Sequence, residues 1–261
     1  MVFKHPVPFW SDAFCSGTGM VIPKHLFEPY RGARSREAPS NLAPCGAGPY
    51  RGLAFNPGDM IRAKINLGYH VANRPFFDTL ELKSGGDAVS AARAVMQTGE
   101  YDLGWNMQVD DDLLRRLEQG GRGHVVIVPA GNPEHIQLNQ TDPRREVDGE
   151  RSSIKTVHPF LTDPALRSAL PLLADRATIQ EQIYGRQGQA TANFLNAPAR
   201  FASPNLRWEF IRMNDLVVQS GVVIPIVARN GASAVSNQLR GVDFSSWSGT
   251  LWKLAYWYRE P

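Results

Sequence analysis

The spacing of apolar residues predicts helices alternating with strands along most of the chain. Over Ala91–Met96 they recur three to four positions apart, which predicts a helix that Asp87 begins and Gly99 ends. The five residues Tyr101–Trp105 alternate instead, as in a short strand. Strand-like sequence recurs at 60–69, 79–82, 124–128, 136–139 and 222–227. Helices alternating with strands favour an α/β fold over a β-sandwich.

Capping residues and prolines predict where further elements begin, bend and end. Asp110–Asp112 places three acids at the start of a short helix, where the helix dipole favours them. Asp163–Pro164 is typical of a helix start, and Pro171 predicts a kink in the same helix. The segment 187–204 is predicted to be a loop. Pro225 predicts that the strand around it lies at a sheet edge or contains a bulge.

Composition and charge describe an ordinary globular chain. Of the 261 residues, 43% are hydrophobic and 20% are charged, and 28 basic against 25 acidic side chains leave a net charge of +3. That balance argues against a nucleic-acid-binding surface. The longest apolar runs have the length of strands, so no membrane span is predicted. The N-terminus MVFKHPVPFW has two prolines and no apolar core, so read alone it predicts no secretory signal and a cytoplasmic chain.

Cys15 and Cys45 are the only two cysteines, and two interpretations of them stay open. Their spacing matches no zinc site. A disulfide between them would stabilise the fold by roughly 3–4 kcal/mol in an oxidising compartment. Two free thiols are the favoured interpretation.

Residues that commonly carry catalysis or bind metals form no recognisable motif. The six histidines are scattered, and the sequence has neither a nucleophile elbow nor a phosphate-binding loop. Glu100 and Asp102 would share one face of a strand, but without a second acid or base they are weak evidence for a hydrolase. The glycines of 46–50 precede no helix, as a dinucleotide site would require. The sequence therefore predicts no enzyme, no metal and no cofactor.

Trp105 and Asn106 follow the short predicted strand and admit two interpretations. The simpler one is a core tryptophan followed by a turn residue. The alternative places the indole and the carboxamide on the wall of a ligand cleft, where one apolar ring and one polar group would serve recognition.

Six segments stand out together along the chain. They are IPKHLF at 22–27, GAGPY at 46–50, AARAVMQTGEYDLGWN at 91–106, HIQLN at 135–139, DPALRSAL at 163–170 with ADR at 174–176, and MND at 213–215 with VIP at 223–225. In this order they resemble the peptide-binding, family 5 solute-binding components of ABC importers. The resemblance implies an α/β fold of the periplasmic-binding-protein type II kind, with two lobes.

Two departures from the family pattern bear on the architecture. The chain begins downstream of the family's signal peptide and first lobe segment, and a long piece is missing at about Glu209–Ile211. The resemblance therefore implies an incomplete two-lobe protein, truncated at the N-terminus and internally deleted. We expect a remnant of an N-terminal-lobe extension at 1–45, a main α/β lobe at 46–140 with 221–261, and a remnant of the second lobe at 141–220.

The resemblance implies a periplasmic, non-enzymatic protein that binds peptides or small solutes and docks on an ABC permease. It places seven residues in a ligand cleft between the lobes: Trp105, Asn106, Met107, Gln108, His135, Gln137 and Asn139. Because one cleft wall is largely missing, the alternative is a remnant without ligand binding, or an interaction module.

Overall fold

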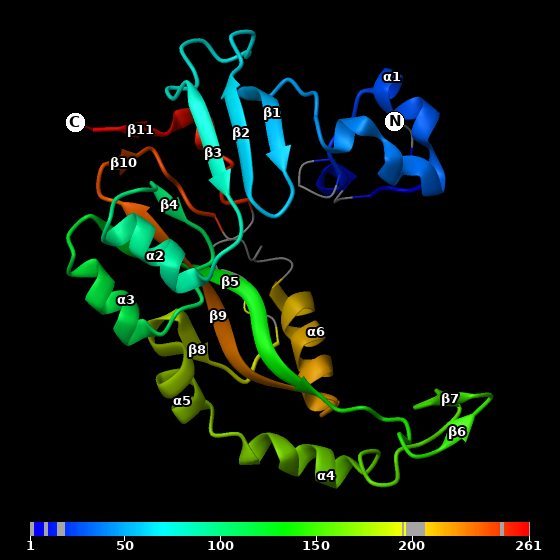
Figure 1. Ribbon diagram of the computed structural model, residues 1–261. Helices are drawn as coiled ribbons and strands as arrows, with labels where there is room; N and C mark the ends of the chain where they lie inside the picture. Colours follow the sequence, from blue (N-terminus) through cyan, green and yellow to red (C-terminus); the bar gives the residue numbers. More distant parts are fainter. Residues whose placement is uncertain are drawn as a thin grey trace. The chain divides into compact units, whose positions relative to one another are not determined.

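The chain forms two compact units in the computed structural model (Figure 1). The structure describes residues 3–7, 10–14, 19–194, 196, 207–245 and 248–260, without the side chains of 12, 13, 53 and 207–211. Unit 1 consists of Met1–Ala91 with Ser236–Pro261, and unit 2 of Ala92–Val235. The division into three parts expected from the sequence stays a prediction.

Unit 1 contains a three-stranded antiparallel sheet. Its strands follow in the order β1 (Tyr50–Asn56), β2 (Met60–Ile65) and β3 (Thr79–Lys83). Gly58 joins β1 to β2 with a φ of +80°, a left-handed conformation that glycine adopts without a Cβ clash. The strand predicted over 60–69 ends earlier, at Ile65, because Tyr69 N donates to Asn66 O and closes a turn there.

Short elements complete unit 1 at both ends of the chain. The N-terminal segment contains η1 (Trp10–Ala13), α1 (Lys24–Phe27), η2 (Glu28–Tyr30), η3 (Gly32–Glu37) and η4 (Pro39–Asn41). The C-terminal segment contains β10 (Leu239–Arg240), η9 (Leu254–Tyr256) and β11 (Tyr258–Arg259), and β10 pairs with β11. Trp257, between η9 and β11, is buried, which brings the aromatic tail into the interior of unit 1.

Unit 2 is organised around β9 (Val223–Ser236), the central strand of its sheet. It pairs with β4 (Leu103–Gly104), β5 (Gly123–Gln137) and β8 (Gly188–Ala190). The helices α2 (Ala88–Met96) and α3 (Asp111–Glu118) are amphipathic, as their spacing predicts. The largest fully buried side chains come from these helices and from β9: Val95, Met96, Leu114, Leu117 and Val227.

The chain between β5 and β9 folds into short elements. They are β6 (Glu146–Val147), β7 (Glu150–Arg151), α4 (Pro164–Ala169), η5 (Leu170–Leu173), α5 (Arg176–Ile179), η6 (Gln180–Tyr184), η7 (Gly185–Gln187), β8 and α6 (Arg207–Gln219). A half-buried ion network fastens η7 to α3. The Arg186 guanidinium lies 2.6 Å from both Asp111 Oδ1 and Glu118 Oε2.

The local signals for helix ends are confirmed. Asp87 Oδ1 accepts a hydrogen bond from Ser90 N at 2.8 Å at the start of α2, and Gly99 follows that helix with a φ of +70°. Asp110 caps α3, and its side chain accepts the amides of the second and third following residues. Asp163 likewise caps α4, and Pro171 lies where the α-helix gives way to the 3₁₀ turns of η5.

Two predictions about strands are wrong, and a third is wrong in one of its two alternatives. The run 124–128 and the first two residues of the run 136–139 belong to one continuous strand, β5, which ends at Gln137. Its Pro129 and Pro133 are tolerated because β5 is an edge strand. Pro225 lies in β9, the central strand of the sheet, so the predicted edge position is wrong, whereas the alternative of a bulge stays a prediction. This proline lies beyond Val227, the last β9 residue that pairs with β8, and its carbonyl accepts from Arg176 Nε at 2.8 Å. The predicted loop over 187–204 contains β8.

The predictions for the cysteines and the aromatic tail are answered in part. Cys45 is a free, exposed thiol, and Cys15 lies outside the described residues. Of the tail tryptophans, Trp257 is buried, Trp252 is 47% exposed, and Trp247 lies outside the described residues. No helix in the described ranges is long and apolar enough to cross a membrane.

Candidate ligand-binding site

Trp105 stands on a tightly fixed turn at the end of β4. Its side chain is 68% exposed, so the interpretation as a core residue is wrong. Asn106 has a φ of +55°, a left-handed conformation that asparagine tolerates better than most residues, which confirms it as a turn residue. Gln108 N donates to Asn106 O at 2.9 Å, and Met107 N donates to Ala232 O of β9 at 2.8 Å. The backbone on either side of the indole is therefore held in place.

Met107 lies in the core rather than at the surface. It is 3% exposed, and its Sδ and Cε come within 3.2 Å of the position that a Cβ on Gly104 would occupy. Gly104 itself pairs with Ala234 of β9. The absence of a side chain at Gly104 thus leaves room for Met107, which packs beneath the turn. Trp105, Asn106 and Gln108 are exposed to solvent.

His135 belongs to a second polar group at the end of β5. Its Nδ1 lies 2.9 Å from Pro133 O, and its Nε2 lies 3.1 Å from Gln137 Nε2. A carbonyl oxygen can only accept, so Nδ1 carries the proton and Nε2 accepts from the amide. The Phe194 ring packs edge-on against the imidazole with centroids 5.4 Å apart. These contacts hold the His135 ring in one orientation.

Asn139, the last predicted residue, uses its side chain locally. Its Oδ1 accepts from Thr141 N at 2.9 Å and from Thr141 Oγ1 at 2.7 Å. Such a turn orders the chain after β5 and leaves the amide nitrogen of Asn139 as the group that can face a ligand. Gln137 and Asn139 are both exposed.

The predicted residues form two groups rather than one. Met107, in the first group, donates its N–H to Ala232 O of β9. Leu138, which lies between Gln137 and Asn139 of the second group, donates its N–H to Val222 O, immediately before β9 begins. Residues 222 and 232 are ten positions apart, which corresponds to a path of about 33 Å at about 3.3 Å per residue. The sequence alone did not predict the distance between the two groups.

One ion pair lies beside the second group. Arg229 Nη1 lies 3.1 Å from Glu134 Oε1, beside His135 in the sequence. Burial raises the pKa of the Tyr184 phenol, the Glu134 carboxylate raises it further, and Arg229 lowers it in part. Tyr184 therefore stays protonated and remains a hydrogen-bond donor at neutral pH.

The match to known proteins covers most of the chain. Residues 1–210 match the family of bacterial extracellular solute-binding proteins, family 5, middle. The chain belongs to this family. This match confirms the resemblance drawn from the six sequence segments. Family 5 proteins are non-enzymatic binders that serve ABC importers. A search of curated protein sequences finds no match.

Solved structures show the same periplasmic-binding-protein fold for this family 5 chain. The ABC transporter substrate-binding protein CtaP of Listeria monocytogenes has a TM-score of 0.69 at 14% identity, over 91% of this chain and 71% of that one. The oligopeptide-binding protein AppA of Bacillus subtilis, in complex with a nonapeptide, has a TM-score of 0.66 at 12% identity, over 92% of this chain and 72% of that one. NikZ of Campylobacter jejuni, in complex with Ni(L-His), has a TM-score of 0.65 at 12% identity, over 97% of this chain and 75% of that one. About seven tenths of each is covered, consistent with an incomplete architecture.

The predicted internal deletion falls where the family match stops. The match ends at residue 210, inside the interval Glu209–Ile211, and the backbone there belongs to one continuous helix, α6. The side chains at 209–211 lie outside the described residues. The deletion therefore stays a prediction, in agreement with the end of the match.

The premise of a hydrolase site is wrong. Glu100 and Asp102 do not share a strand, because Glu100 N donates to Ala94 O in the cap of α2 and Asp102 precedes β4. Within the described part of the chain, no three His, Cys, Asp or Glu side chains come together as metal ligands.

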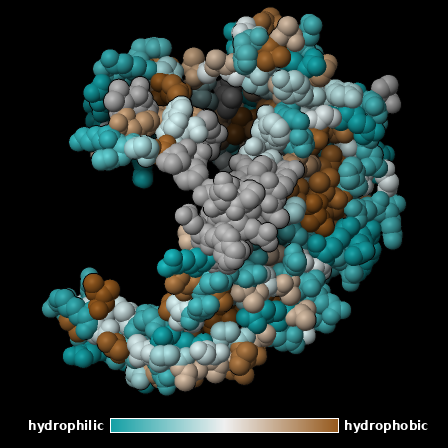
Figure 2. Space-filling view, turned by 180° about the vertical axis from the view of Figure 1, so that it is seen from behind, coloured by the Kyte–Doolittle hydropathy of each residue, from teal (hydrophilic) through white to brown (hydrophobic). Residues whose placement is uncertain are grey.

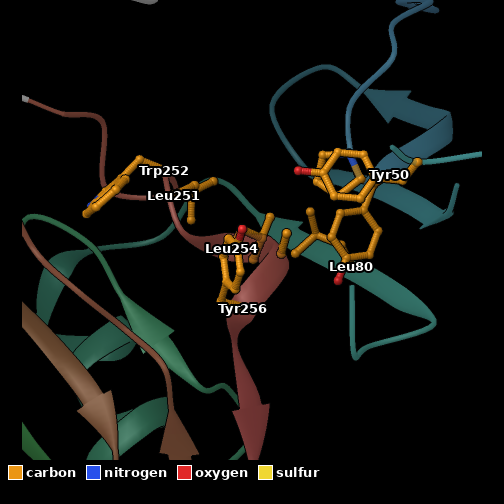
Figure 3. Close-up of a pocket in the computed structure, with 9 residues that line it drawn as sticks. Tyr50, Leu80, Leu251, Trp252, Leu254 and Tyr256 are labelled. Atoms are coloured by element: carbon orange, nitrogen blue, oxygen red, sulfur yellow. The ribbon is translucent and has the colours of Figure 1, made fainter. Parts of the chain in front are cut away.

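Sequence reasoning missed a pocket in unit 1. It measures about 300 Å³ and lies between the start of β1, β3 and the segment around η9 (Figure 3). Four of its nine lining residues are aromatic, namely Tyr50, Tyr69, Trp252 and Tyr256. Burial and the charge of Asp78 raise the pKa of Tyr50 to about 12. The aromatic tail was the only sequence signal, and it did not point to β1.

Proposed function

We propose that this chain is the substrate-binding component of a peptide importer. Its ligand would be a peptide or a related small solute, bound in a cleft between the two predicted lobes and delivered to an ABC permease. A periplasmic location belongs to the same proposal. Membership of family 5 supports the class of function, and the two polar groups of unit 2 support the ligand contacts.

The exposed indole of Trp105 is the observation that carries this proposal. Exposure alone does not single it out, because the face shown in Figure 2 has several separate apolar patches among hydrophilic residues. Ile154 and Leu172 are even more exposed, at 93% and 85%. Trp105 is the aromatic case: its ring is exposed while hydrogen bonds and the buried neighbour Met107 hold the backbone after it. A rigid exposed tryptophan binds a partner at low entropic cost, and tryptophan is a frequent hot-spot residue.

The polar neighbours of Trp105 suit a peptide backbone. The side chain of Asn106 accepts a hydrogen bond from Gln108 Nε2 at 3.3 Å, which orients both amides. Each amide retains further donor and acceptor capacity for the N–H and C=O groups of a ligand. None of the residues 104–108 of this turn is charged, which favours recognition of backbone and apolar groups.

Calorimetry with a library of di- to decapeptides tests this function. We expect saturable heat that weakens at least tenfold in Trp105→Ala, because the stacking surface is lost. Trp10→Ala is the matched control, since it removes another exposed indole, 52% exposed and in unit 1. Peptide binding that is absent, or equal in both variants, would overturn the proposal.

A remnant without ligand binding is the second candidate. The separation of the two polar groups along β9 favours it, because neither group alone encloses most of a ligand. Thermal melting distinguishes the two candidates. A cooperative transition that no peptide shifts at saturating concentration supports the remnant, whereas a shift that grows with peptide concentration supports the binding protein.

A further inference from the structure

The orientation of the His135 ring depends on a contact from outside β5. Pro133 O and Gln137 Nε2, which contact the two ring nitrogens, belong to the same strand as His135. The Phe194 ring instead reaches the imidazole from the segment 191–194, with centroids 5.4 Å apart and ring planes at 77°. An edge-to-face pair of this kind is favourable only in a defined geometry. The placement of Phe194 therefore helps to set how the imidazole is presented to a ligand.

A buried asparagine of α6 fixes the backbone at Phe194. Asn214 is 9% exposed, and its Oδ1 accepts a hydrogen bond from Phe194 N at 2.8 Å. Its Nδ2 donates to Asn193 Oδ1 at 3.1 Å. The carboxamide of Asn214 thus bonds to two consecutive residues, and it holds the backbone from which the Phe194 ring projects.

Further hydrogen bonds order the same segment. Thr191 N donates to Ile226 O of β9 at 3.1 Å, and Thr191 Oγ1 donates to Asn196 Oδ1 at 3.0 Å. Asn196 Nδ2 in turn donates to Asn193 O at 2.9 Å. These bonds tie the start of the segment to β9 and fold its backbone back on itself. Asn214 then holds the residue that contacts His135.

Asn214 and Phe194 lie on opposite sides of the predicted deletion. The family match ends at residue 210, so Phe194 precedes the predicted junction at Glu209–Ile211 and Asn214 follows it. The backbone of α6 runs through this interval as one helix. A side chain beyond the matched region therefore holds a residue inside it. The contact to His135 is one that the chain makes with the deletion in place.

We propose that Asn214 is a positioning residue of the peptide site. It holds Phe194 against His135 and so keeps the imidazole in the orientation that meets the ligand. The effect on affinity rests on the peptide-binding function proposed above. The structural step, from Asn214 through Phe194 to His135, needs no ligand and is tested separately.

Proton NMR of the His135 imidazole tests the structural step on the full chain without peptide. Phe194→Ala removes the ring current and should shift the His135 signal, which its loss in His135→Gln assigns. Asn214→Ala should shift the signal in the same direction, by at least half as much. The double variant should match Phe194→Ala alone, because Asn214 acts through the ring. A His135 signal unchanged in Asn214→Ala, or additive shifts in the double variant, would overturn the proposal.

Asn66→Ala is the matched control for the loss of a buried asparagine. Asn66 is 7% exposed in unit 1, and its side chain likewise donates one hydrogen bond, to Gly48 O, and accepts one, from Gly68 N. Both alanine variants should melt at a lower temperature, whereas the His135 signal should change only in Asn214→Ala. Asn214→Leu, which has a similar shape and no hydrogen-bonding atoms, answers the same question if Asn214→Ala does not fold.

Calorimetry with decapeptides tests the effect on binding. We expect Asn214→Ala to raise the Kd about threefold, because part of one aromatic pair is lost, and Asn66→Ala to leave it unchanged. If the unaltered chain binds no peptide, the proposed function fails while the His135 signal still decides the structural step. If peptides bind and the His135 signal shifts in Asn214→Ala without any loss of affinity, the positioning role is contradicted.

Discussion

Replacing Met107 with alanine separates a core role from a ligand-contact role for this residue. The side chain is 3% exposed, and the substitution removes three heavy atoms beyond Cβ. At about 0.8 kcal/mol for each methylene-sized group, the lost transfer energy is about 2.4 kcal/mol. The space under Gly104 that Sδ and Cε fill adds a cavity cost, because β9 limits how far the turn can collapse. We expect a total of about 3–4 kcal/mol, within the range of buried Met→Ala changes.

Urea denaturation followed by circular dichroism measures this loss for Met107→Ala. Met107→Leu is the matched control and should cost less than about 1.5 kcal/mol, since it nearly conserves volume. Peptide affinity of the folded fraction should stay within twofold for both variants, because the side chain faces the core. An unchanged midpoint for Met107→Ala together with a tenfold loss of peptide affinity would refute this reasoning and return Met107 to the ligand site.

Two further predictions concern the link between η7 and α3. Burial raises the pKa of Asp111, but hydrogen bonds and the charge of Arg186 outweigh burial and leave the pKa below its ordinary value of 3.8. The stability that this carboxylate contributes is therefore present above about pH 4 and lost as the pH falls through its folded pKa. In urea denaturation at several pH values, Asp111→Asn should lower the free energy of unfolding by about 2 kcal/mol at pH 7. Below pH 4 the free energy of unfolding of this variant should fall less steeply than that of the unaltered chain. An unchanged slope contradicts this assignment. Gly185→Ala should lower the melting temperature, at a cost of about 2 kcal/mol or more, because Gly185 has a φ of +52° and a Cβ there would lie 2.6 Å from Asp111 Cβ. Gly48→Ala is the control and should leave the melting temperature unchanged, because the space around Gly48 is open.

Features set by neighbours in the sequence could be predicted, and features set by distant contacts could not. Asp87 and Asp110 cap helices because their partners lie two or three residues away, so the pattern alone contains the answer. The continuity of β5 depends instead on pairing with β9, about a hundred positions later, which overrides the local signal of two prolines. The pocket of unit 1 joins Tyr50 to Trp252 across most of the chain, and no periodicity links them.

The candidate site shows the same division between local and distant information. The turn at Asn106 follows from its residue type, but the burial of Met107 beside an exposed Trp105 depends on Gly104 and on β9. Family resemblance found both polar groups, because their segments keep the family's order. It did not give their spacing, because resemblance reports order along the chain and not distance in the fold.

That spacing makes peptide length the most informative variable in binding experiments. A fully extended peptide advances about 3.3–3.6 Å per residue, so about ten residues are needed to follow the path of about 33 Å along β9 between the two groups. We therefore expect His135→Ala to leave the Kd of tripeptides within twofold of the unaltered chain and to weaken decapeptides about fivefold, because only the longer ligand reaches the imidazole. Calorimetry at both lengths measures this difference, and Trp105→Ala should weaken both. A tripeptide that loses affinity in His135→Ala as strongly as a decapeptide would show that the two groups act as a single site, contrary to their positions at opposite ends of β9.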